Sequence, residues 1–175
     1  MLAKHGWKFL TKPHTLVAQI YKAKYFPTTN FLEATLGSNP SFTWRSVWMA
    51  KSILVRGCRW RVGKGNEINM WNSPWLRNLP SNMLQTSPPP GTENLKVCNI
   101  ITENRTWNME LMRTMLCYSD IEQVCRVYLS PRPIPDRIIW CMTKRGQYSV
   151  KSGYWLHKNR SASSNQVNNR GWAKL

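Results

Sequence analysis

Apolar residues recur at helical spacing along much of the chain, and proline, glycine or short polar runs interrupt them. Over residues 1–26 this pattern predicts two short helices separated by Pro13, because proline cannot donate the backbone hydrogen bond that a helix interior requires. A third helix is expected to begin after Ser41, which favours helix N-termini, and to end at Gly57, which favours helix C-termini.

The hydrophobic period changes from helical to alternating after Gly57. Residues 58–62 and 67–71 alternate on either side of the turn residues 63–66, which predicts a β-hairpin. Residues 137–141 and 147–150 alternate around a turn at 144–146 and predict a second hairpin. Tryptophans 60, 71 and 75 are expected to pack in the core, since large aromatic rings contribute most when they are buried.

Shorter helical patterns fill the rest of the second half. Helices are expected near residues 97–101, over 109–116 and over 120–127, the last with Ser119 as its N-cap, and again over 151–157. Residues 159–171 are rich in Asn and Ser, a composition typical of disordered chain.

A stretch rich in proline, serine and asparagine, residues 77–95, is the clearest boundary in the sequence and is either a linker or an extended surface crossing. The sequence thus predicts an α+β fold, mainly helical with two small β-hairpins. Residues 1–76 form a helical segment plus hairpin, and residues 96–175 form short helices plus a hairpin.

The net charge of the chain indicates which kinds of partner it can bind. Lys and Arg total 25 and Asp and Glu total 8, which gives a net charge of +17, and the excess is present in both halves of the chain. Such a surface favours RNA or DNA bound through phosphate contacts, although acidic domains of a longer protein could also balance it. No apolar run approaches the length that crosses a bilayer, so no membrane partner is expected. Nothing predicts a small-molecule substrate or an obligate oligomer.

The side chains that usually carry catalysis or metals are sparse. The two aspartates, Asp120 and Asp136, and the six glutamates form no adjacent pair of the kind that holds two metal ions. Asp120 is expected to complement a helix dipole. The five cysteines include no Cys-x-x-Cys pair, and Cys117 and Cys125 have no histidine near them. We predict no catalytic residue, no bound metal and no cofactor.

Several strings, in the same order and spacing, resemble the C-terminal part of plant non-LTR (LINE-type) retrotransposon polyproteins of the reverse-transcriptase-like or ribonuclease H type. They are LAKHGW (2–7), KAKYFP (22–27), PSFTWRS (40–46), GCRWRVG (57–63), DRIIW (136–140) and YSVKSGY (148–154). Between Trp71 and Trp75 the family usually has an acidic residue, whereas this chain has Asn72-Ser73, so any role of that acid is lost here.

The resemblance implies a truncated fragment that follows the polymerase core and enters the start of the reverse-transcriptase zinc-binding region. The catalytic aspartates would precede Met1, and the Cys/His cluster and ribonuclease H domain would follow Leu175. A nuclear or cytoplasmic location is implied, in preference to an organelle. Such truncation is expected to expose an apolar face on the N-terminal helices, around Trp7, Phe9 and Leu10.

Basic residues near the two predicted hairpins form the best candidate binding site. Arginine and lysine neutralise phosphates, so we predict non-specific binding of the RNA or DNA backbone. The alternatives are a structural connector between the polymerase and zinc-binding regions, or a degenerate retroelement remnant with no selected function. The candidate residues are Arg56, Arg59, Arg61, Lys64, Lys144, Arg145 and Lys151.

Overall fold

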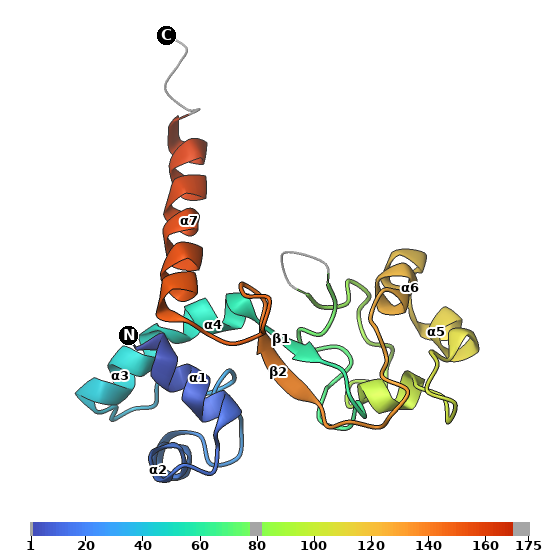
Figure 1. The fold of residues 1–175 in the computed structure, drawn as a ribbon, viewed down its shortest axis with the longest axis horizontal. Coiled ribbons are helices and arrows are strands. Elements are labelled where there is room, and N and C mark those ends of the chain that lie inside the picture. Colours follow the sequence, from blue (N-terminus) through green and yellow to red (C-terminus); the bar gives the residue numbers. More distant parts are fainter. Residues whose placement is uncertain (1, 78–81, 170–175) are drawn as a thin grey trace. The chain divides into compact units, whose positions relative to one another are not determined.

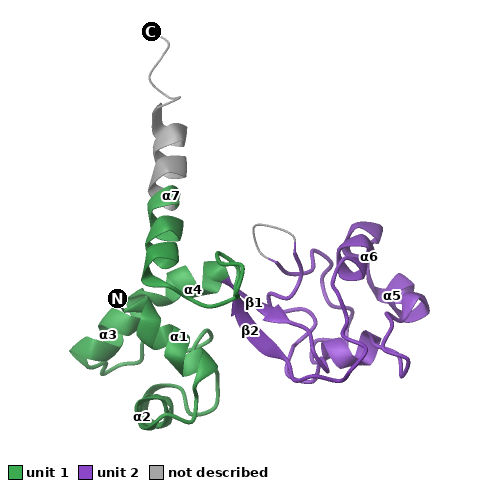
Figure 2. Cartoon of the chain, viewed as in Figure 1, with its two compact units in different colours: residues 1–57, 140–175 green, residues 58–139 purple. Residues whose placement is uncertain are grey.

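A computed structural model describes residues 2–77 and 82–169, with side chains described up to Asn159. The chain forms two compact units, residues 1–57 with 140–175 (unit 1) and residues 58–139 (unit 2), as Figure 2 shows. The fold is α+β and mainly helical, with one two-stranded antiparallel sheet, which confirms the predicted class. The boundaries of these units differ from those of the predicted segments, because β1 (Cys58–Arg61) and β2 (Arg137–Trp140) pair with each other. Unit 2 therefore begins and ends at this strand pair, at residues 58 and 139.

Unit 1 is built from helices, in the order shown in Figure 1. The break at Pro13 and the start after Ser41 are confirmed, since the Ser41 hydroxyl accepts a hydrogen bond from the Trp44 amide at 3.2 Å. The helix predicted to run from there to Gly57 is divided by a turn at Ala50. The helices are α1 (Ala3–Thr11), α2 (Leu16–Tyr25), α3 (Phe42–Met49), α4 (Lys51–Gly57) and α7 (Val150–Asn169).

Aromatic rings form the core of unit 1. Trp44 is fully buried and stacks on Tyr25, with ring centroids 4.5 Å apart and planes 4° from parallel. Trp140 is also fully buried, and its ring lies 4.9 Å from that of Tyr148 in an edge-on arrangement. A side chain at Gly57 would come within 2.2 Å of the Trp140 ring. Glycine at position 57 therefore lets the end of α4 approach this ring.

Unit 1 has an exposed apolar face on α2, one of the two N-terminal helices, but not around Trp7 and Phe9, where it was expected. Trp7 and Phe9 are buried because α1 packs against α3, α4 and α7. On α2, which the structure describes in full, the side chains of Leu16, Val17 and Ile20 are 71%, 53% and 56% exposed. These three residues form the α2 apolar face.

Helix α7 extends beyond its predicted end. The composition of residues 159–171 predicts disorder, but the helix continues to Asn169, and residues 170 and 171 lie outside the described part of the chain. Neither glycine nor proline occurs between Tyr154 and Asn169, so the sequence contains no strong helix breaker there. Within the described residues, no helix is long and apolar enough to cross a membrane.

Unit 2 contains the sheet and three short helices. The predicted helices near 97 and 109 are confirmed, while the third begins at Tyr118 with Cys117, not Ser119, at its N-cap position. The last residue of β2, Trp140, belongs to unit 1. The elements are β1 (Cys58–Arg61), the 3₁₀ helix η1 (Val97–Ile100), α5 (Met109–Met115), α6 (Tyr118–Cys125) and β2 (Arg137–Trp140).

The two predicted hairpins are replaced by a single long-range strand pair. Strand β1 pairs with β2, which begins 76 positions after β1 ends, at residue 137 against residue 61. Residues 67–71 form no strand beyond a bridge between Asn69 and Lys96. Residues 147–150 also form no strand, although the turn predicted before them is present, with Gly146 at φ 67°.

The Asp136 carboxylate explains this change of partner. It accepts hydrogen bonds from the backbone amides of Gly63, Gly65 and Glu67 at 2.7, 2.8 and 3.0 Å. A side chain at Gly63 would come within 2.2 Å of the Ile134 carbonyl oxygen, so only glycine allows this approach. Residues 63–67 therefore fold around the carboxylate that precedes β2, and β1 pairs with β2 in place of residues 67–71.

The core of unit 2 confirms the predicted burial of two tryptophans. Trp71 and Trp75 are 5% and 1% exposed, and Trp60 is half-buried and packs against the same cluster. Their indole nitrogens are satisfied inside the unit: Trp75 donates to the Met70 carbonyl at 2.8 Å, and Trp71 donates to the Thr92 carbonyl at 2.7 Å.

The described part of the proline-rich stretch crosses the surface of unit 2 as an anchored segment. Asp120, fully buried in the first turn of α6, accepts hydrogen bonds from the amides of Gln85 and Thr86 and from the Thr86 hydroxyl, the last at 2.6 Å. The Leu95 carbonyl accepts a hydrogen bond from the Met70 amide. These bonds favour the surface crossing over a free linker, and residues 78–81 lie outside the described chain.

Replacing Asp136 with alanine is expected to lower the free energy of unfolding by about 2 to 4 kcal/mol, because three hydrogen bonds to a charged group are lost and two buried glycine amides are left unsatisfied. Urea denaturation followed by circular dichroism measures the loss. The matched control is Glu122→Ala, which removes a carboxylate that pairs with Arg126 on the exposed surface of α6 and should change stability little. Equal effects of the two substitutions would contradict the assigned role.

Candidate nucleic-acid interface

The predicted binding residues fall at several places in the two units. Arg59 and Arg61 lie on β1 and line one pocket. Lys64 is exposed in the loop held by Asp136. The remaining four are exposed in unit 1, at the end of α4, in the turn after β2 and in the first turn of α7; they are Arg56, Lys144, Arg145 and Lys151.

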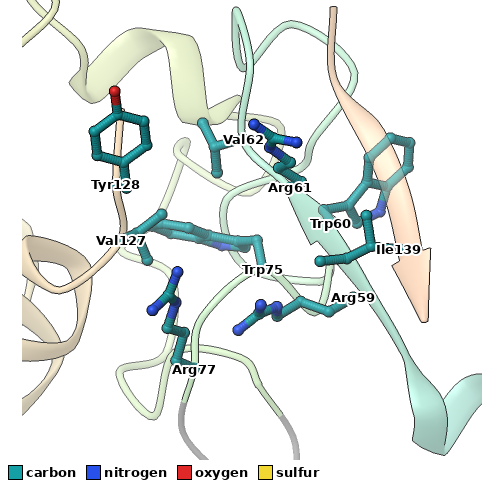
Figure 3. Close-up of a pocket in the computed structure, with 9 residues that line it drawn as sticks. All are labelled: Arg59, Trp60, Arg61, Val62, Trp75, Arg77, Val127, Tyr128 and Ile139. Atoms are coloured by element: carbon teal, nitrogen blue, oxygen red, sulfur yellow. The ribbon is translucent and has the colours of Figure 1, made fainter. Parts of the chain in front are cut away.

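The pocket is a hollow of about 270 Å³ within unit 2 (Figure 3). The side chains of Val62, Trp75 and Val127 are buried and form its apolar part, while those of Trp60 and Ile139 are half-buried. The other lining residues are Arg59, Arg61, Arg77 and Tyr128.

Hydrogen bonds beside β1 bring Arg77 to this pocket. The Trp60 amide donates to the Pro74 carbonyl at 2.7 Å, and Arg59 Nη1 donates to the Leu76 carbonyl at 3.4 Å. Residues 74–77 therefore run along β1. The amide of Trp75 donates to the Asn82 carbonyl at 2.8 Å, so residues on both sides of the undescribed segment are held together and Arg77 stays at the pocket.

Positive charge dominates the pocket. In Figure 3 the Arg59 guanidinium points toward Arg77 below the Trp75 ring, the Arg77 side chain extends toward that ring, and Arg61 lies above it. None of the described lining residues is acidic. Charges of one sign gathered around a hollow with apolar walls focus the local field there. The arrangement suits an anion that can accept hydrogen bonds from more than one guanidinium.

Arg105 also holds the loop that follows β1, through a carbonyl oxygen of that loop. Its guanidinium donates to the carbonyl oxygens of Gly63 at 2.6 Å and Ser130 at 3.2 Å. The backbone of Arg105 is in the left-handed region, with φ 60°. The loop after β1 thus donates hydrogen bonds from its amides to the Asp136 carboxylate and accepts one at the Gly63 carbonyl from the Arg105 guanidinium. Arg105 is a structural cation, in contrast to the exposed Arg61 and Arg77.

Lys51 in unit 1 is another structural cation. Its ammonium group donates to the Ala34 carbonyl at 2.6 Å and lies 5.3 Å from the centre of the Trp48 ring. Burial lowers the pKa of Lys51, because desolvation disfavours the charged form. This lysine stabilises the turn before α3.

Sequence reasoning missed Arg77 and Tyr128. Arg77 was not predicted as a binding residue because it begins the proline-rich stretch, where basic residues are usually solvated. Tyr128 follows α6 and has no neighbours in the sequence that mark it as part of a site. Their proximity to β1 depends on long-range packing. For Arg77 the sequence does contain one local signal: this arginine comes two residues after Trp75, which was predicted to lie in the core.

Both aspartates are fully engaged with the backbone. Asp120 binds the amides of residues 85 and 86, and Asp136 binds those of residues 63, 65 and 67. Among the residues that the structure describes, no group of three or more His, Cys, Asp or Glu side chains could hold a metal ion. The five cysteines, all in the described part of the chain, form no disulfide.

The chain is similar to two proteins of Arabidopsis thaliana. An uncharacterized mitochondrial protein is 31% identical over 90 residues, which cover 51% of this chain and 54% of the relative. A protein named "Putative ribonuclease H protein" is 22% identical over 161 residues, which cover 88% of this chain and 26% of the relative. The matches thus span about half of the first relative and about a quarter of the second. No protein-family model matches the chain, and no solved structure matches it.

These similarities support the resemblance to retroelement polyproteins of the ribonuclease H type. The match to the second relative extends over most of the chain, as the order of the quoted strings does. It therefore covers both units.

The purified chain is expected to show no nuclease or polymerase activity with Mg²⁺ or Mn²⁺, because both aspartates already accept several hydrogen bonds and the described residues include no carboxylate cluster that could hold metal ions. Release of labelled nucleotides and primer extension are the measurements. Asp120→Asn and Asp136→Asn serve as the diagnostic variants. Metal-dependent turnover that disappears in either variant, with the fold intact, would contradict this expectation.

Proposed function

We propose that the chain is a non-catalytic segment of a retrotransposon reverse-transcriptase polyprotein that binds the RNA or DNA backbone through the pocket beside β1. The observation that carries this proposal is the convergence of Arg59, Arg61 and Arg77 on one hollow whose described lining contains no carboxylate. A phosphate group matches the guanidinium in charge and hydrogen-bond geometry.

The charge of the whole chain supports a polyanionic ligand. The formal net charge is +17, and both aspartates are engaged with backbone amides rather than with arginines or lysines. An excess of cations over acidic residues raises the rate and strength of encounters with a polyanion, and that attraction falls as salt increases. The described contacts include no sequence-reading module, so binding should depend little on base sequence.

Two similarities support the origin of the segment. The quoted strings resemble reverse-transcriptase-like polyproteins, and a relative that carries a ribonuclease H name matches most of this chain while being much longer. The polymerase and ribonuclease H activities of such a polyprotein would belong to other segments. In this proposal the present segment contributes affinity for template or target nucleic acid.

A structural connector is the second candidate, and the α2 apolar face favours it. Leu16, Val17 and Ile20 are more than half exposed on one short helix. Exposed apolar side chains grouped in this way can pack against a neighbouring region of a longer polyprotein. This function would need no nucleic-acid contact.

The double variant Arg61→Gln/Arg77→Gln tests the backbone-binding proposal. Both side chains are exposed, so their replacement should leave the fold intact. Affinity for RNA and DNA at low salt should fall roughly tenfold, and the log–log slope of affinity against salt should flatten by about 1.5, since about 0.7 to 0.9 ions are released per phosphate contact. Fluorescence anisotropy across a salt titration measures both quantities.

The control is Arg113→Gln/Arg132→Gln, which removes the same charge from exposed positions of unit 2 outside the pocket. This variant should alter the slope much less. If the two double variants weaken binding equally, the contact is diffuse and the pocket is not the site. If the wild type does not bind at low salt, the connector remains.

A further inference from the structure

An exposed aromatic side chain lies at the arginine pocket. Tyr128 lines the pocket and is 67% exposed, whereas the neighbouring Val127 is 8% exposed and packs in the core of unit 2. Figure 3 shows the phenol ring beside the apolar end of the pocket, at Val62 and Val127. The buried neighbour fixes the backbone at this position, so the ring is presented to solvent from an anchored segment.

The other two aromatic rings of the pocket are less available to a ligand. Trp75 is 1% exposed and donates its indole N–H to the Met70 carbonyl. Trp60 is half-buried and packs against the core cluster. Tyr128 is therefore the ring whose face a ligand can cover. Tyrosine offers a large contact area with few rotatable bonds, so its ordering costs little entropy.

We propose that this pocket selects single-stranded nucleic acid, with one unpaired base stacked on Tyr128 and the flanking phosphates bound by Arg61 and Arg77. The inference rests on the proposed function and specifies the form of its ligand. Arginines alone would serve single strands and duplexes alike, because both carry phosphates. An aromatic platform beside the arginines adds a contact that an unpaired base can make, whereas the bases of a duplex are already stacked on one another.

The size and lining of the pocket agree with a single base as the occupant. Its volume of about 270 Å³ is close to the lower end of the range for small-ligand pockets, which starts at about 300 Å³. The apolar residues Val62 and Val127 can contact the edge of a planar ring, and the arginines lie on the rest of the lining. Every base has a π-face, so the selection is for unpaired strands and not for a sequence.

Substitution of Tyr128 separates stacking from phosphate binding. Tyr128→Ala should weaken binding of a single-stranded oligonucleotide of about 12 residues by roughly 5- to 100-fold, the usual range for one stacked base. The salt slope should stay the same, because no charge is removed. Affinity for a blunt duplex of equal length should not change, and Tyr128→Phe should bind the single strand as the wild type does.

The matched control is Tyr118→Ala, which removes another exposed tyrosine of unit 2, 84% exposed on α6 and outside the pocket. It should leave both affinities unchanged. A second readout uses an oligonucleotide that contains 2-aminopurine, whose fluorescence should be quenched by the wild type and by Tyr128→Phe but not by Tyr128→Ala. Circular dichroism confirms that each variant is folded.

Two outcomes would overturn the inference in different ways. If Tyr128→Ala binds the single strand as the wild type does while Arg61→Gln/Arg77→Gln flattens the salt slope, the pocket binds phosphates without stacking and the proposed function stands. If Tyr128→Ala weakens single-strand and duplex binding equally, the ring supports the pocket and does not select strands. A wild type that binds neither ligand would refute the proposed function itself.

Discussion

The Asp136 carboxylate is the constraint on which unit 2 depends. Asp136 lies just before β2 and accepts hydrogen bonds from the amides of Gly63, Gly65 and Glu67, so it joins residues about 70 positions apart in the sequence. A loop of this length costs only a few kcal/mol more to close than a short one, since the entropy grows with the logarithm of length. Three charge-assisted hydrogen bonds offset much of that cost. Once the loop is closed, β1 lies beside β2, and Arg59 and Arg61 are placed with Ile139 in one pocket.

Asp120 uses the same chemistry elsewhere in unit 2. This buried carboxylate holds residues 85 and 86 against α6, as Asp136 holds the loop after β1. A chain with two aspartates and 25 basic residues thus commits both aspartates to backbone amides. Both aspartates are therefore used for folding, and the described lining of the pocket contains arginines but no acidic residue, so its charge favours an anion.

The sequence predicted what depends on local signals. Pro13, Ser41 and Gly57 act within one helical turn, and the helix boundaries they predict are present. Alternation located β1 and β2 but not their pairing, because a strand's period reveals its faces and not its neighbour. The neighbour is set by Asp136, whose partners are distant in sequence. Arg77 and Tyr128 were missed for the same reason: Pro74 and Leu76 must first run along β1 before Arg77 reaches the pocket.

Backbone binding and connection to a neighbouring region are compatible functions, because each has its own surface. The arginine pocket is built entirely within unit 2, and the α2 apolar face belongs to unit 1. The two proposed functions also differ in chemistry: phosphate binding at the pocket would weaken as salt increases, whereas burial of Leu16, Val17 and Ile20 against a partner would be insensitive to moderate salt. In the proposed function, a segment with both surfaces would hold nucleic acid with one unit while the other packs against a neighbouring region of the polyprotein. Substitutions on one surface should leave the other function intact, since the two surfaces share no residue.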